Sequence, residues 1–274
     1  MKRTRKVSRI ILIILLIAVI GFSSIEIWKI SAVYLREAKT KDTLSAYRPG
    51  SPGNRADVVW LANGVQYGAG GTAGGGDSDN GASGGGSQDR PVINRSIIDL
   101  RNDVNADVAG WITIPNTHID YPFVSCGDNS YYLNRDIYGN IAPAGTLFLD
   151  QRCAPDLSDF NTIIYGHNMR NNTMFGDLPL FADEWFFNSN RYGTIYTEYD
   201  TFTLDIFALL VVSAEDETIY DPFANGDAFF RYVKQRARNY REPDRDLSVV
   251  TLSTCGYEFS GARIVVIASL VPDK

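Results

Sequence analysis

The chain opens with a basic cluster that runs directly into an apolar segment. Five cations and no acid occupy residues 1–9, and residues 10–25 follow as sixteen positions without a charge. A helix that crosses a bilayer needs about 20 such residues, and 10–28 supplies nineteen when Glu26 lies at the interface. The pattern predicts a single-pass anchor over 10–28, with 1–9 in the cytoplasm and the remainder outside the cell membrane. A cleaved signal peptide is the alternative, although no small-residue cleavage site is evident.

A glycine-rich segment separates this run from the rest of the chain. Residues 29–67 predict a juxtamembrane helix and loop, and ten of the twenty residues in 68–87 are glycine. No Lys-Ser or Lys-Thr pair accompanies these glycines, which argues against a phosphate-binding loop. We therefore interpret 68–88 as a flexible tether and expect the folded domain over 89–274.

Short apolar runs, bounded by turn residues, fill the remainder. They predict strands over 111–114, 119–124, 146–149, 162–165, 195–199, 203–213, 248–254 and 263–270. Helical patterns are expected over 94–107, 130–135, 173–187 and 227–239. Many short strands with a few helices between them are typical of a β-barrel, so the predicted fold is mainly β with helical insertions.

Composition excludes several classes of protein. The 274 residues are 45% hydrophobic, which is too apolar for a disordered chain. The net charge of −6 argues against a nucleic-acid partner. Three cysteines and two histidines are too few for a disulfide framework or a multi-site zinc protein, and no metal or other cofactor is expected.

Three residues at strand ends could carry chemistry. Cys255 directly follows the run 248–254, and Arg263 begins the next run, so pairing of these two strands would bring the two residues side by side. His167 follows the strand over 162–165, after Gly166, which permits a sharp turn. A nearby cation favours the reactive thiolate, an imidazole can protonate a leaving amine, and a guanidinium can donate to an oxyanion. On spacing alone, a buried structural thiol remains the alternative.

Two segments carry a specific family resemblance. Residues 251–266 resemble the cysteine segment of class B sortases, and 161–169 resemble their histidine segment. Four weaker matches follow the family's order, at 110–112, 119–122, 128–133 and 145–150. The resemblance covers about residues 94–270. It implies an eight-stranded sortase-type β-barrel preceded by an N-terminal helix, with 227–239 as the helix before the cysteine strand.

The resemblance also implies an activity. Cys255 would attack a Thr carbonyl in the C-terminal sorting signal of a secreted protein, with His167 as the acid–base partner and Arg263 stabilising the oxyanion or aligning the substrate. An amine of a peptidoglycan precursor or of another protein would then resolve the acyl-enzyme. Signals of the Asn-Pro-x-Thr and Pro-x-Thr-Gly types both occur in the family. A sortase-like cysteine hydrolase and a non-catalytic wall-binding module of the same fold are the alternatives; the intact Cys, His and Arg set argues against the module.

The family's substrate groove implicates four further residues as substrate-binding: Asn129, Leu133, Ser253 and Tyr220. The connection from the cysteine to the arginine is shorter here than in some members. For that reason no groove role is carried over to 256–262, including a supporting acid at Glu258.

Two other cysteines follow predicted strands. Cys126 comes after 119–124 and Cys153 after 146–149. If these strands are parallel and adjacent, as the resemblance implies, both cysteines emerge at the same edge and a disulfide between them becomes possible. Two free thiols are the alternative.

Overall fold

The computed structural model describes residues 2–50, 59–60 and 92–273. The chain divides into two compact units, Met1–Ala46 and Tyr47–Lys274. The predicted glycine-rich tether over 68–88 lies outside the described residues.

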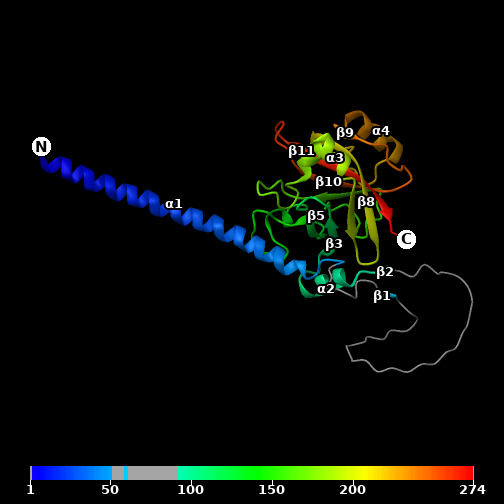
Figure 1. Cartoon of the computed structure of the whole chain (residues 1–274), viewed down its shortest axis with the longest axis horizontal. Coiled ribbons are helices and arrows are strands. Elements are labelled where there is room, and N and C mark those ends of the chain that lie inside the picture. Colours follow the sequence, from blue (N-terminus) through cyan, green and yellow to red (C-terminus); the bar gives the residue numbers. More distant parts are fainter. Residues whose placement is uncertain (1, 51–58, 61–91, 274) are drawn as a thin grey trace, which may run out of the picture. The chain divides into compact units, whose positions relative to one another are not determined.

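The first unit is a single helix, α1 (Lys2–Ser45) (Figure 1). Among the described residues, no helix is both long enough and apolar enough to cross a membrane. The uncharged run over 10–25 has sixteen residues, bounded by Arg9 and Glu26, and falls short of the about 20 that a bilayer requires. The predicted single-pass anchor over 10–28 is therefore wrong, and so is the location in the cell membrane, with an extracellular catalytic domain, that was inferred from it.

The second unit is built on a nine-stranded sheet, of which eight strands close into a barrel. These are β3 (Val108–Thr113), β4 (Asp120–Val124), β5 (Leu147–Leu149), β6 (Asn161–Tyr165), β7 (Tyr192–Tyr196), β8 (Thr201–Ser213), β10 (Val249–Cys255) and β11 (Ala262–Pro272). Their spatial order is β11-β10-β6-β5-β4-β3-β7-β8, and pairing of β8 with β11 closes the ring. The ninth strand, β9 (Asn239–Tyr240), pairs with β8. A separate pair joins β1 (Val59–Trp60) to β2 (Val92–Ile93). The predicted mainly-β, eight-stranded barrel is confirmed.

The two faces of β10 contact different apolar clusters. Val250 and Leu252 belong to the cluster that fills the barrel, to which the other barrel strands also contribute. Val249 belongs to a second cluster on the other face, where α4 (Gly226–Arg236) buries Phe229 and Phe230 against the sheet. Because successive strand residues point to opposite faces, Ser253 and Cys255 lie on the α4 side. The candidate nucleophile is thus outside the barrel core.

The described helices of the second unit are short. They are α2 (Arg95–Asp103), the 3₁₀ turns η1 (Tyr132–Asn134) and η2 (Leu178–Ala182), α3 (Glu184–Ser189) and α4. The helices predicted over 94–107, 130–135 and 227–239 are confirmed in position. The single helix predicted over 173–187 is wrong, because Asp183 has an extended backbone and caps α3 by accepting a hydrogen bond from the Phe186 amide. A carboxylate in that N-cap role begins a new helix there.

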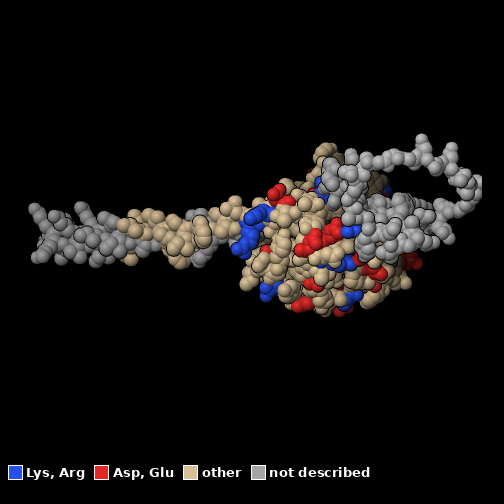
Figure 2. Space-filling model, turned by 90° about the horizontal axis from the view of Figure 1, so that it is seen from below, with Lys and Arg blue, Asp and Glu red and all other residues tan. Residues whose placement is uncertain are grey.

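Charges of both signs lie on one face of the molecule. Figure 2 shows acidic and basic side chains interspersed on its visible face. The net charge of −6 is therefore not gathered into one acidic patch on that face.

Candidate active site

The cysteine and the arginine lie directly opposite each other. Strands β10 and β11 are antiparallel, and Cys255 is the register partner of Arg263, which confirms the predicted juxtaposition. Opposite residues of an antiparallel pair place their side chains on the same face of the sheet. The connecting loop is closed by a 2.9 Å hydrogen bond from the Gly256 amide to the Ala262 carbonyl. Gly261 has φ +78°, a left-handed conformation that favours glycine.

His167 approaches β10 from the other side. Strand β6 is parallel to β10, and Tyr165 is registered with Ser253. Three hydrogen bonds continue this pairing beyond the end of β6: the Gly166 amide donates to the Ser253 carbonyl (3.1 Å), the Thr254 hydroxyl to the Gly166 carbonyl (2.7 Å), and the Asn168 side chain to the Cys255 carbonyl (2.8 Å). The residue between Gly166 and Asn168 is thereby held alongside the Cys255 end of β10.

Gly166 is needed for close packing. A Cβ atom on it would lie 2.4 Å from Leu147 Cδ2 and 2.7 Å from Phe175 Cδ2, which leaves no room for a side chain. Phe175 also donates its amide to the His167 carbonyl (3.0 Å), so the loop folds back onto the strand end. The sequence predicted that Gly166 permits a turn. In the structure, the absence of a side chain on Gly166 also lets Leu147 and Phe175 pack closely against the backbone that leads to His167.

The imidazole of His167 has a defined orientation. Its Nε2 lies 2.7 Å from the carbonyl oxygen of Leu133. A carbonyl only accepts, so Nε2 carries a hydrogen, and Nδ1 is the nitrogen left to gain or lose a proton. Leu133 was predicted to bind substrate; in the structure its backbone orients the histidine, while its side chain is exposed.

Two predicted groove residues are hydrogen-bonded on the same face as the cysteine. The hydroxyls of Tyr220 and Ser253 lie 2.8 Å apart. Burial raises the pKa of Tyr220 to about 12, so its hydroxyl stays protonated near neutral pH.

Arg263 donates one of its five N–H groups to the Ala262 carbonyl (3.0 Å) within the described part of the chain. The guanidinium keeps further donors for a bound substrate.

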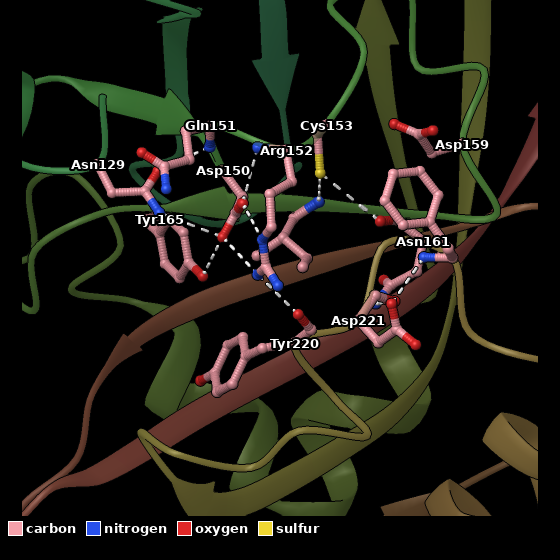
Figure 3. A network of polar contacts seen from close by, with 12 residues as sticks. Asn129, Asp150, Gln151, Arg152, Cys153, Asp159, Asn161, Tyr165, Tyr220 and Asp221 are labelled. Carbon is pink, nitrogen blue, oxygen red and sulfur yellow. Dashed lines mark hydrogen bonds and ion pairs between the residues drawn. The ribbon is translucent and has the colours of Figure 1, made fainter. Parts of the chain in front are cut away.

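Asn129, the fourth predicted groove residue, is held by a polar network that sequence reasoning missed (Figure 3). Its side-chain amide donates to Asp150 (3.3 Å) and accepts from the Gln151 amide (2.7 Å). Asp150 is buried and also accepts from Arg152 and Tyr165. The sequence feature that could have indicated this network is Asp150, an acidic residue that ends the apolar run of the motif 145–150.

The remaining cysteines are free thiols. Strands β4 and β5 are parallel neighbours, as expected, yet the two thiols have separate partners. The exposed Cys126 contacts the Asp128 carbonyl at 3.4 Å. The buried Cys153 accepts from the Ile163 amide at 3.3 Å, and burial raises its pKa to about 11. The structure therefore has two free thiols at these positions in place of the disulfide.

Comparison with known proteins supports one family. A family model described as Sortase domain matches residues 112–271, more than half of the chain. Sortase B of Listeria monocytogenes is 32% identical over 190 residues, which cover 65% of this chain and 77% of that protein. The structure of Clostridium perfringens sortase B aligns with a TM-score of 0.59 and 34% identity over 64% of this chain and 98% of that one. A Staphylococcus aureus sortase B–substrate complex aligns with a TM-score of 0.61 and 27% identity over 66% and 87%. With the closed barrel and the strand-end cysteine, histidine and arginine, these matches show that the chain belongs to the sortase family, class B.

Proposed function

We propose that this chain is a cysteine transpeptidase that cleaves the C-terminal sorting signal of a secreted protein and transfers that protein to an amine. The observation that carries the proposal is the position of Cys255 on β10, opposite Arg263 on one side and beside the strand end that bears His167 on the other. Nucleophile and cationic donor then belong to two adjacent strands of one sheet, and the acid–base group follows the end of a third.

The first half-reaction forms a thioester. The Cys255 thiolate attacks the carbonyl carbon of a Thr in the signal, and the carbonyl oxygen gains negative charge. Arg263 donates hydrogen bonds to this oxygen or aligns the peptide. The C–N bond after the Thr breaks as protonated His167 gives its Nδ1 proton to the departing amine.

The second half-reaction releases the product. An amine of a peptidoglycan precursor or of another surface protein attacks the thioester carbon and loses a proton to neutral His167. The C–S bond breaks and Cys255 leaves as thiolate, which restores the starting state. Water in place of the amine would give hydrolysis. Tyr220, Ser253, Asn129 and Leu133 are proposed to form the surroundings in which the signal binds.

A direct assay tests this function. The full chain is incubated with fluorogenic peptides of the Asn-Pro-x-Thr and Pro-x-Thr-Gly types, with and without triglycine as the amine. We expect a protein adduct at Cys255 with the mass of the acyl fragment, and a product that contains triglycine. Product from water alone would instead identify a hydrolase. An absence of adduct and cleavage with every peptide would contradict both enzymatic functions.

A further inference from the structure

A buried carboxylate joins several chain segments, among them one that carries a predicted groove residue. The Asp150 side chain is 1% exposed and follows β5. Its Oδ1 accepts from Arg152 Nε (2.8 Å), and its Oδ2 accepts from Arg152 Nη2 (2.9 Å) and the Tyr165 hydroxyl (2.9 Å). Asn129 adds a longer hydrogen bond of 3.3 Å. Figure 3 shows these groups converging on one carboxylate.

The donors come from both sides of the site. Asn129 belongs to the loop after β4, and Tyr165 ends β6 two positions before His167. Arg152 reaches further, because its Nη2 also donates to the backbone carbonyl of Tyr220 at 2.7 Å (Figure 3). Tyr220 belongs to the loop between β8 and α4, and its hydroxyl contacts Ser253. One ion pair thus connects the two loops that carry predicted groove residues.

The charge on Asp150 strengthens its pairing with Arg152. Burial alone would raise the pKa of Asp150, but the hydrogen bonds from Arg152 and Tyr165 outweigh it and hold the pKa below its ordinary value. The carboxylate is therefore charged at neutral pH. A buried charge is tolerated only when it is paired and hydrogen-bonded, so separation of Arg152 from Asp150 would cost free energy.

We propose that Asp150 and Arg152 are a positioning pair that sets the separation of the Asn129 loop and the Tyr220 loop, and thereby the affinity for the sorting signal. The inference rests on the proposed function and extends it to two residues with no expected role. The bonds of this pair lead to Asn129, Tyr165 and Tyr220, so it acts through the walls of the groove. Its loss should weaken peptide binding more than the chemical step.

The key variant is Arg152→Met, which removes both connections while keeping an apolar side chain at a half-exposed position. The matched control is Arg191→Met, which breaks another two-bond pair, between Arg191 and Asp205 (2.6 Å each). Asp205 is registered with Ser269 of β11, six residues or roughly 20 Å along the strand from Arg263. For Arg152→Met we expect KM to rise about tenfold, as for loss of a charge-assisted hydrogen bond, with kcat within about twofold of wild type. Arg191→Met should leave both unchanged.

A conservative variant distinguishes a positioning role of Arg152 from a nonspecific loss of structure. Arg152→Lys keeps the charge but lacks the planar fork that serves Asp150 and Tyr220 together, so its KM should lie between those of Arg152→Met and wild type. The rate at which iodoacetamide alkylates Cys255 should be the same in all variants. Equal KM values for Arg152→Met and wild type, or equal losses in Arg152→Met and Arg191→Met, would overturn the proposal.

Hydrogen exchange supplies a readout that does not depend on turnover. In Arg152→Met, backbone amides of 126–133 and 214–222 should exchange faster, while those of β10 and β11 keep the wild-type rate. Arg191→Met should leave both loops unchanged. A wild-type chain that cleaves no sorting peptide would contradict the proposed function, whereas unchanged exchange in the two loops of Arg152→Met would contradict the positioning pair itself.

Discussion

Cys255 is the register partner of Arg263 across the antiparallel pair of β10 and β11. The backbone position of Arg263 is fixed by a barrel strand. Its loop is short and closed at Gly256, so the pair has little freedom to separate. The candidate nucleophile thus lies directly across the sheet from an arginine.

Replacement of Arg263 tests the role of the planar fork. Arg263→Lys keeps the positive charge but loses the geometry for two parallel hydrogen bonds. We expect kcat/KM for a sorting peptide to fall about tenfold or more, because donors to a developing oxyanion contribute a factor of roughly 10² to 10³. Arg191→Lys, in an ion pair elsewhere on the barrel, is the control. Wild-type rates for Arg263→Lys would remove Arg263 from the mechanism.

Cys255 and Cys126 should differ in function. Cys255→Ala should abolish the acyl adduct, because the proposed nucleophile is lost. Cys126→Ser should react at the wild-type rate, since Cys126 is an exposed free thiol that contacts Asp128. Mass spectrometry of the chain after incubation with peptide measures both. An adduct on Cys126, or on the Cys255→Ala variant, would disprove the assignment of the nucleophile.

Gly166→Ala should displace the histidine loop. The new Cβ would lie 2.4 Å from Leu147 Cδ2, so either that side chain or the loop must move. Overpacking of this kind costs about 1–3 kcal/mol in the free energy of unfolding. Turnover should fall together with stability, measured by urea denaturation. Gly21→Ala, where no atom lies within 4 Å of the added Cβ and alanine favours the helix, is the control and should lower neither quantity.

The acid side of the stability profile should depend on Asp150. Its pKa is held below the ordinary 3.8, with burial opposed and outweighed by donors from Arg152 and Tyr165. A carboxyl with a depressed pKa in the folded state stabilises the protein above its unfolded-state pKa, and this contribution is lost as the pH falls through the folded-state value. Asp150→Asn should therefore be less stable than wild type near pH 7, and the gap should narrow below about pH 4. A gap that stays constant from about pH 7 to about pH 3 would contradict this linkage.

The sequence alone predicted most of the barrel strands, because short apolar runs bounded by turn residues mark them, although β7 spans Tyr192–Tyr196 and not the predicted 195–199. It also indicated that Cys255 and Arg263 would lie side by side if their strands paired, and the antiparallel register of β10 and β11 confirms this. The prediction of one helix over 173–187 was wrong because it followed the apolar pattern and overlooked Asp183, which caps the start of α3. The anchor over 10–28 was wrong because its uncharged run is bounded by Arg9 and Glu26.

Only the tertiary structure decided what surrounds the candidate cysteine. The hydrogen bonds of Asp150 and Arg152 join segments as distant in sequence as Asn129 and Tyr220. A local sequence pattern cannot predict a contact between such distant segments. The parallel pairing of β6 with β10, which brings the His167 loop to Cys255, likewise depends on how the whole barrel closes. Local periodicity determines which residues form strands and which face each side chain occupies. The hydrogen bonds by which the Asp150–Arg152 pair reaches both loops depend on long-range packing.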